Sequence, residues 1–179
     1  METLSLFETN ITHSSSIIDN KALLERVYQF QKITPTELRS CVGGYQGYDF
    51  NDEIYLNEIK RVLPQKPDKP IIDFELQSWV NINGNGAWND VHCHQDNGVF
   101  LSGCYYLKCP ENSGGIRFYD PRNTSGSYEK YYGKGGFVRF NPYEGLILFF
   151  PPYLKHLVEP NQSNENRVSI AFNICNAKF

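Results

Sequence analysis

The chain has 179 residues, of which 40% are hydrophobic and 15% aromatic, a composition typical of a globular protein rather than a disordered one. Its formal net charge of −3 gives no reason to expect nucleic acid or an anionic membrane as a partner. The longest apolar run, residues 146–153, is too short to span a bilayer. We therefore expect one domain over residues 1–179 that is large enough to bury a core.

The start of the chain and its cysteines bear on the cellular compartment. Residues 1–16 contain neither a basic segment nor a long apolar run, so we expect no signal peptide. The five cysteines are scattered without a Cys-x-x-Cys pair, which is typical of reduced thiols rather than of a disulfide framework. Together these features favour a cytoplasmic location.

Residues 1–69 are predicted to be mainly helical and to support the rest of the chain. In residues 17–35, Asp19 or Asn20 is a suitable N-cap, and a helix would stop before Pro35. Residues 51–64 repeat the pattern. The residues expected on the buried faces are Leu23, Leu24, Val27 and Phe30 in the first helix and Ile54, Leu56, Ile59 and Leu63 in the second.

From residue 70 the pattern changes to short strands separated by Gly, Pro and Asn turns. Short strands at this spacing predict a sandwich or jelly roll, so residues 70–179 are the expected β core of a mainly β protein with N-terminal helices. A polar, Gly- and Tyr-rich segment from Asn123 to Gly136 interrupts the series and, with residues 43–50, could form a lid. The predicted strands lie in residues 71–83, 99–109, 114–120, 145–152, 156–160 and 167–175.

Histidine and aspartate stand close together before one of these strands. His94 and Asp96 are two residues apart, so on a strand their side chains would share one face and reach a single cation. Imidazole and carboxylate ligands suit Fe(II), and a second histidine would complete a facial triad with open positions for oxygen and substrate. His156, which opens a later strand, is the expected third ligand. Alone, a His-x-Asp pair is more often a local hydrogen-bonding feature than a metal site.

Arg167 and Ser169 form the next group of interest. On the last predicted strand they point to the same face and present a guanidinium fork and a hydroxyl, which suit one buried carboxylate. One of Tyr105 and Tyr106 must face the same interior and could add its phenol. The alternative is that Arg167 forms an exposed ion pair with a neighbouring glutamate, which would contribute little to stability.

Taken in order, these motifs resemble the Fe(II)- and 2-oxoglutarate-dependent dioxygenase superfamily. The resemblance is carried by His94-Gln95-Asp96, "SGCYYLKCPENSGGIRF" (residues 102–118), "GLILFFPPYLKHLVEP" (145–160) and "NRVSIAFN" (166–173), and it extends from about Gly43 onward. It is closest to uncharacterised oxygenase-like proteins common in marine phages and bacteria, and more distant to prolyl hydroxylases. A phage-encoded chain of this kind would work in the host cytoplasm.

The resemblance implies a double-stranded β-helix that uses Fe(II) and, as a cosubstrate, 2-oxoglutarate. His156 matches the family's distal histidine ligand. Arg167 matches the arginine that binds the distal carboxylate of 2-oxoglutarate, Ser169 would assist it, and Tyr106 matches a tyrosine that reaches 2-oxoglutarate in prolyl hydroxylases.

The ligand pair before the strand can be aligned in two ways, because the close relatives carry His-x-His where the wider superfamily has His-x-Asp or His-x-Glu. Aligning from the N-terminal side makes His92 and His94 the pair and requires two extra residues before "LSG". Aligning backwards from "LSG" makes His94 and Asp96 the pair without a gap. We favour the second, which leaves His92 as the alternative direct ligand.

The predicted function is hydroxylation of a protein or peptide side chain, or of a small metabolite, with no catalytic residue beyond the metal centre. Two alternatives come from other classes. One is a cupin-like metalloenzyme without 2-oxoglutarate, and the other is a non-catalytic jelly-roll module with a binding or structural role.

Overall fold

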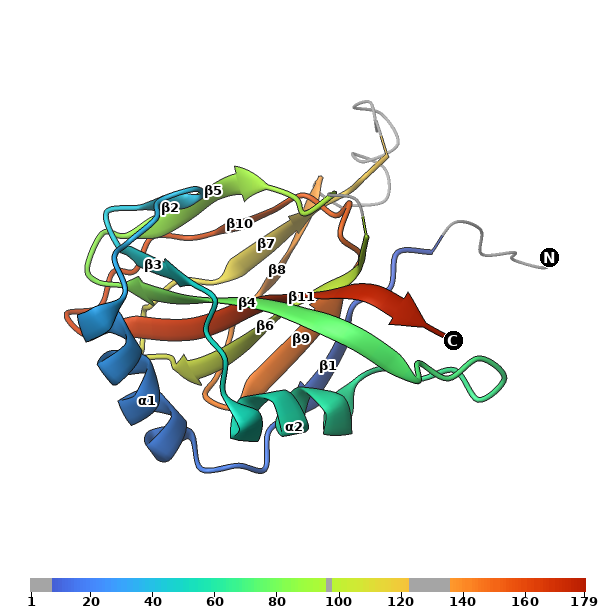
Figure 1. Cartoon of the computed structure of the whole chain (residues 1–179). Helices are drawn as coiled ribbons and strands as arrows, with labels where there is room; N and C mark the ends of the chain where they lie inside the picture. The colour runs from blue at the N-terminus through green and yellow to red at the C-terminus, as the bar shows by residue number, and fades with distance from the viewer. Residues whose placement is uncertain (1–7, 96–97, 123–135) are drawn as a thin grey trace.

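The computed structural model describes residues 8–95, 98–122 and 136–179. In these residues two antiparallel sheets face each other, and both helices lie on the outer side of the larger sheet (Figure 1). The larger sheet has the strand order β1-β9-β6-β11-β4-β3, and the smaller one has the order β2-β5-β10-β7-β8. No described helix is long and apolar enough to cross a membrane.

The bounds of the elements follow. The helices are α1 (Asn20–Ile33) and α2 (Glu53–Val62). The strands are β1 (Thr12–Ser15), β2 (Cys41–Val42), β3 (Tyr45–Tyr48), β4 (Asp73–Asn83), β5 (Trp88–His92), β6 (Val99–Lys108), β7 (Ile116–Tyr119), β8 (Phe137–Phe140), β9 (Leu146–Phe150), β10 (His156–Val158) and β11 (Arg167–Lys178).

Both predicted helices form, and a carboxylate caps each N-terminus. Asp19 accepts a hydrogen bond from the backbone N–H of Lys21 at 2.9 Å, so it is the N-cap of α1. The buried face of α2 differs from the prediction, because Ile54 is 42% exposed whereas Tyr55 and Ile59 are fully buried. Tyr55 and Ile59 are four residues apart and therefore share a face. The large aromatic ring of Tyr55 buries more apolar area there than Ile54 could.

The strands predicted from residue 70 onward all form, so the expectation of a mainly β fold is confirmed. The sequence did not reveal β1, β2 and β3, which contain two to four residues each and pair with strands that lie more than 30 residues further along the chain. The sequence also gave no sign of β5 and β8. Short strands of this kind form because a longer partner supplies the ladder of hydrogen bonds, which leaves little local signal.

The central strands β4, β6 and β11 are buried on both faces, and side chains alternate between them. On the outer face, Val80, Tyr105 and Phe172 pack with α1 and α2 in one apolar cluster. The inner face looks toward the smaller sheet, where Tyr106 and Phe150 join an apolar cluster with residues of β7. The site described below lies on this inner face.

Candidate metal and cosubstrate site

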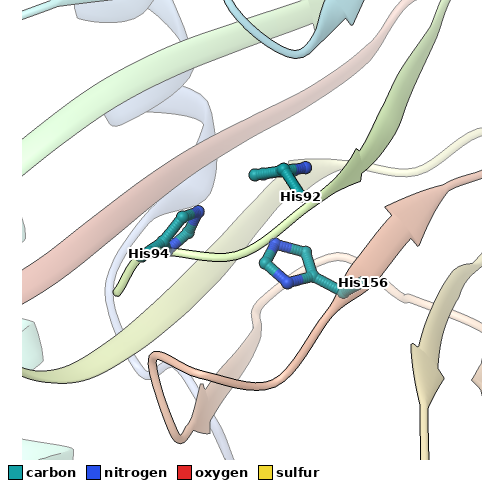
Figure 2. Close-up of side chains that lie close together, drawn as sticks. All are labelled: His92, His94 and His156. Carbon is teal, nitrogen blue, oxygen red and sulfur yellow. The ribbon is translucent and has the colours of Figure 1, made fainter. Parts of the chain in front are cut away.

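Three histidines from two segments meet at one end of the space between the sheets (Figure 2). His92 is the last residue of β5, His94 follows it by two residues, and His156 is the first residue of β10. Because β5 and β10 pair in antiparallel register with His92 opposite His156, the two imidazoles are neighbours, with ring centroids 4.3 Å apart. The centroid of His94 lies 5.0 Å from that of His156 and 5.1 Å from that of His92.

Hydrogen bonds fix which ring nitrogen of each histidine is free. Nδ1 of His92 lies 2.6 Å from the carbonyl oxygen of Asp90, and Nδ1 of His156 lies 2.9 Å from that of Leu154. A carbonyl oxygen can only accept, so both Nδ1 atoms carry the proton and both Nε2 lone pairs are free. Nδ1 of His94 contacts the hydroxyl of Ser102 at 2.9 Å, and its buried Nε2 has no partner among the described residues.

This arrangement suits a divalent metal. The potential ligand atoms of the three histidines lie within 4.8 Å of one another. Burial is the main reason that the pKa of His94 is lowered to about 4 and that the pKa of His156 is well below its usual value, and burial also lowers the pKa of His92. All three imidazoles are therefore neutral at pH 7, and the neutral form is the one that binds metals.

The structure thus brings together two of the three metal ligands favoured from the sequence, His94 and His156, and adds the alternative ligand, His92. Asp96, the third favoured ligand, lies outside the described residues. A backbone hydrogen bond of 2.8 Å from His94 to the carbonyl of Pro152 ties its segment to the turn before His156.

Beyond the histidines, the inner face of β4, β11 and β6 forms regular rows of cross-strand neighbours. Trp79, Ala171 and Cys104 are aligned in one row, and the next row contains Asn81, Ser169 and Tyr106. These residues line a narrow pocket that also touches all three histidines. The small side chains of Ala171, Ser169 and Cys104 border this space, whose volume is about 30 Å³.

Arg167 lies two residues beyond Ser169 on the same face of β11, and it is 1% exposed. One guanidinium nitrogen, Nη1, donates to the backbone carbonyls of Ser113 and Glu159. Its Nε and Nη2, like the hydroxyl of Tyr106, are buried without a hydrogen-bond partner in the described part of the chain. Buried donors without partners are rare and costly, so a bound carboxylate is the natural acceptor for them.

The neighbouring glutamates do not neutralise Arg167. The carboxylate of Glu159 instead pairs with Arg117 at 2.5 Å and with Arg139 at 2.7 Å, and Glu165 pairs with Lys108 at 2.7 Å. The alternative of an exposed ion pair for Arg167 is therefore wrong. Tyr106 and Ser169 both line the narrow pocket, whereas Tyr105 packs in the outer cluster.

A larger cavity of about 550 Å³ opens on the other side of His92 and His94. One wall is aromatic: Tyr48 stacks on Trp79 with ring centroids 5.8 Å apart, and the guanidinium of Arg39 lies 4.2 Å from the centroid of Tyr48. The polar residues Gln46, Asp49, Gln77, Ser78, Asp90 and Asn173 line the rest, with Ser40, Val91 and Cys93. This cavity can hold a substrate next to a metal.

Most residues of this cavity were not found from the sequence. Tyr48 belongs to residues 43–50, which were expected to form a lid, and it does lie at the cavity. The other half of that expected lid, residues 123–135, lies outside the described residues. A signal that could have found Asn173 in this cavity, and Asn81 in the narrow pocket, is their position as amides in largely apolar strands, since buried polar side chains need a specific partner.

Comparison with protein families gives one match. Residues 77–173, more than half of the chain, match the family model described as "Putative 2OG-Fe(II) oxygenase". No sequence among the curated proteins matches this chain.

Solved structures with a similar fold include a prolyl-4-hydroxylase from Pseudomonas putida, with a TM-score of 0.65 and 13% identity over 93% of this chain and 92% of that one. A prolyl hydroxylase from Trichoplax adhaerens, in complex with a peptide fragment of hypoxia inducible factor, has a TM-score of 0.65 and 17% identity over 92% and 83%. HygX from Streptomyces hygroscopicus, with nickel and 2-oxoglutarate bound, has a TM-score of 0.64 and 10% identity over 93% and 83%.

These likenesses confirm the double-stranded β-helix expected from the sequence. The family match decides between the three classes of function that the sequence left open, because neither the cupin-like enzyme nor the non-catalytic module belongs to that family. The chain belongs to the 2OG-Fe(II) oxygenases, and it is an oxidoreductase that uses Fe(II) and 2-oxoglutarate.

Proposed function

We propose that this chain binds Fe(II) through His92, His94 and His156 and hydroxylates a protein or peptide side chain, or a small metabolite. The observation that carries the proposal is the convergence of three neutral imidazoles, each with its Nδ1 proton held by the protein. Fixing Nδ1 in this way orients Nε2 toward the shared space, as in known metal sites.

The choice of His92 as the third ligand, rather than Asp96, rests on strand pairing. The register of β5 and β10 sets His92 opposite His156, so these two imidazoles are neighbours without any adjustment of the backbone. A carboxylate from Asp96 would make the site less positive by one charge. Separate variants of the two residues distinguish the two ligand sets.

For the cosubstrate, we propose that Arg167 binds the distal carboxylate of 2-oxoglutarate, with help from Tyr106 and Ser169. The free Nε and Nη2 of Arg167 and the free hydroxyl of Tyr106 support this assignment, because one carboxylate can accept from all of them. Burial lowers the pKa of Arg167, but a guanidinium remains charged at pH 7. When bound, iron and 2-oxoglutarate would supply the oxidising chemistry with O2 as co-reactant: one oxygen atom of O2 would enter succinate, which forms with loss of CO2, and the other would enter the substrate as the hydroxyl group.

The protein's own part is to orient and to exclude water. The rings of Phe150 and Phe118 pack against His156 at centroid distances of 4.8 and 5.9 Å, and Trp79 packs edge-on against His94 at 5.3 Å. These aromatic contacts restrict the imidazoles and keep the metal side of the pocket apolar. The open cavity next to His92 and His94 would hold the substrate.

Two substrate classes fit this cavity. The Trichoplax adhaerens structure holds a peptide fragment, and another HygX structure holds hygromycin B, so proteins of this fold bind both peptides and small molecules. We rank a protein or peptide side chain first and a small metabolite second. The net charge of −3 favours neither nucleic acid nor a membrane, and the five free thiols favour a reducing, cytoplasmic compartment.

The test is an anaerobic titration of the purified protein with Fe(II) and 2-oxoglutarate, followed by visible absorption. We expect a weak charge-transfer band with the wild type and none with His156→Ala. The matched control is His13→Ala, which removes the one histidine that is exposed and lies outside the site. The proposal is wrong if the wild type shows no charge-transfer band, or if the band is undiminished in His156→Ala.

The same titration decides the third ligand and the cosubstrate residue. If His92 is the ligand, His92→Ala loses the band and Asp96→Ala keeps it, and the reverse result returns the assignment to Asp96. Arg167→Lys keeps the charge but removes the fork, so we expect at least tenfold weaker binding of 2-oxoglutarate with metal binding retained. Succinate release against a panel of peptides and metabolites, with mass spectrometry for an added oxygen, then identifies the substrate class.

A further inference from the structure

A chain of buried hydrogen bonds leads away from His94. Ser102 on β6 and Asn173 on β11 are directly opposite each other, so their side chains share the inner face. The hydroxyl of Ser102 contacts Nδ1 of His94 at 2.9 Å and donates to Oδ1 of Asn173 at 2.8 Å. Ser102 is fully buried and Asn173 is 6% exposed, so water does not compete freely for these bonds.

The direction of these bonds follows from the donors available. A hydroxyl has one proton, and Ser102 gives it to Asn173, so Ser102 must accept from His94. Nδ1 of His94 therefore carries the proton, and Nε2 keeps the lone pair that a metal needs. Removing either the serine hydroxyl or the amide oxygen would release this constraint.

The amide of Asn173 has a second hydrogen-bonding atom, the donor Nδ2. Oδ1 of Asn173 accepts from Ser102, and Nδ2, the other branch of this planar amide, forms no hydrogen bond within the described part of the chain. Asn173 also lines the cavity of about 550 Å³ beside His92 and His94. A donor in that position can bind a carbonyl or hydroxyl oxygen of whatever occupies the cavity.

We infer that Ser102 and Asn173 are positioning residues that hold the metal ligand His94, and that Asn173 also donates a hydrogen bond to a carbonyl oxygen of the substrate. The inference rests on the proposed function, since it gives the cavity's occupant a specific chemistry. Hydrogen bonds in a chain polarise one another, so a substrate that accepts from Nδ2 strengthens the hydrogen bonds from His94 to Ser102 and from Ser102 to Asn173. Substrate binding and metal geometry are thereby coupled through one amide.

The first test measures metal affinity with Co(II) alone. Trp79, with its ring centroid 5.3 Å from that of His94, makes tryptophan fluorescence a direct readout. We expect Ser102→Ala and Asn173→Leu to weaken Co(II) binding by about 10- to 100-fold, the usual effect of losing such an outer partner. Asn173→Asp keeps the acceptor for Ser102, so it should bind Co(II) at least as tightly as the wild type.

Ser78→Ala is the matched control, because it also removes a buried hydroxyl beside the cavity. The Ser78 hydroxyl donates to the carbonyl of Phe50 at 2.6 Å and touches no histidine, so Co(II) affinity should not change. Urea unfolding shows whether each variant is folded. If Ser102→Ala does not fold, the comparison of Co(II) affinity between Asn173→Leu and Asn173→Asp replaces it. If Ser102→Ala and Asn173→Leu bind Co(II) as tightly as the wild type does, the positioning role is overturned and the proposed function stands. If the wild type itself does not bind Co(II), both are overturned.

The second test examines the cavity with N-methylacetamide, which mimics a peptide group. Crystals of the Ni(II) and 2-oxoglutarate complex are soaked with this probe. In the wild type we expect its carbonyl oxygen within hydrogen-bond distance of Nδ2 of Asn173. In Asn173→Asp the carbonyl should leave this position, because a carboxylate can only accept. A probe that avoids Asn173 in the wild type, or keeps its carbonyl there in Asn173→Asp, overturns the substrate contact.

Discussion

The outer and inner faces of β4, β6 and β11 are built from alternating residues of the same strands, yet their chemistry differs sharply. On the outer face, Val80, Tyr105, Ile170 and Phe172 pack with the two helices, and the contacts are almost entirely apolar. On the inner face the corresponding positions are largely polar. They include Asn81, Asn83, Ser102, Ser169, Asn173 and the buried Arg167.

The difference shows how one sheet separates stability from chemistry. Apolar burial on the outer face stabilises the fold by roughly 25 cal/mol per Å². Polar groups on the inner face gain little on folding, because each must replace its hydrogen bonds to water. Some do so with each other, as Asn83 does when it donates to Asn89 at 3.2 Å, but Arg167 and Tyr106 keep buried donors that have no partner among the described residues.

The largest expected effect is on the outer face. Phe172 is fully buried and packs edge-on against Phe149 and Tyr55, with ring centroids 5.5 and 6.2 Å away. Phe172→Ala should lower the free energy of unfolding by about 3–5 kcal/mol, as measured by urea denaturation. Phe172→Leu, the milder control, should lose less than half as much. A loss below about 1 kcal/mol for Phe172→Ala would contradict the assignment of stability to this face.

The intermediate effect lies one residue away, on the inner face. Ala171 lines the narrow pocket between the histidines and Ser169, so Ala171→Leu should fill space needed by 2-oxoglutarate. Calorimetry with Ni(II) present should show at least tenfold weaker binding of 2-oxoglutarate, or about 1.4 kcal/mol. Ala177→Leu, on the same strand but away from the pocket, is the control. If Ala171→Leu instead lowers the free energy of unfolding as much as Phe172→Ala does, the two faces do not differ in their contribution to stability.

The smallest effect concerns a charge buried in the outer layer. The pKa of Glu58 on α2 is lowered to about 2, chiefly by its hydrogen-bonded ion pair with Arg61, and its Oε1 also accepts from the backbone N–H of Ile17 at 2.9 Å. A lowered folded-state pKa means that the ionised carboxylate stabilises the fold above about pH 4.5 and that this contribution is lost as the pH falls toward 2.

Glu58→Gln should therefore be less stable at pH 7, by about 1 kcal/mol or less once solvent screening is considered, and less sensitive to acid. Urea denaturation at pH 7, 5 and 3 measures both. Glu159, whose pKa is also lowered to about 2, chiefly by its hydrogen bond to Arg139, keeps part of the acid sensitivity in the variant. If the free energy of unfolding of Glu58→Gln falls between pH 5 and pH 3 as much as that of the wild type, Glu58 does not contribute to the acid sensitivity.

Much of the fold could be predicted because its signals are local. The apolar and β-branched runs from residue 70 onward gave every long strand, and Asp19 gave the start of α1. The short strands β1, β2 and β3 could not be predicted, since they depend on partner strands that are distant in sequence. The face of α2 was misjudged because spacing alone does not weigh the larger area buried by Tyr55 against that of Ile54.

By itself, the sequence determined the fold class, the family resemblance and the candidates His94, His156 and Arg167, because motif order and alternation along strands are properties of the chain. Only the tertiary structure brought His92 beside His156, since that contact depends on the register of β5 and β10, whose paired residues are far apart in sequence. The same holds for the Ser102–Asn173 pair behind His94. Hydrogen-bond direction and burial are set by neighbours in space, and no spacing along the chain encodes them.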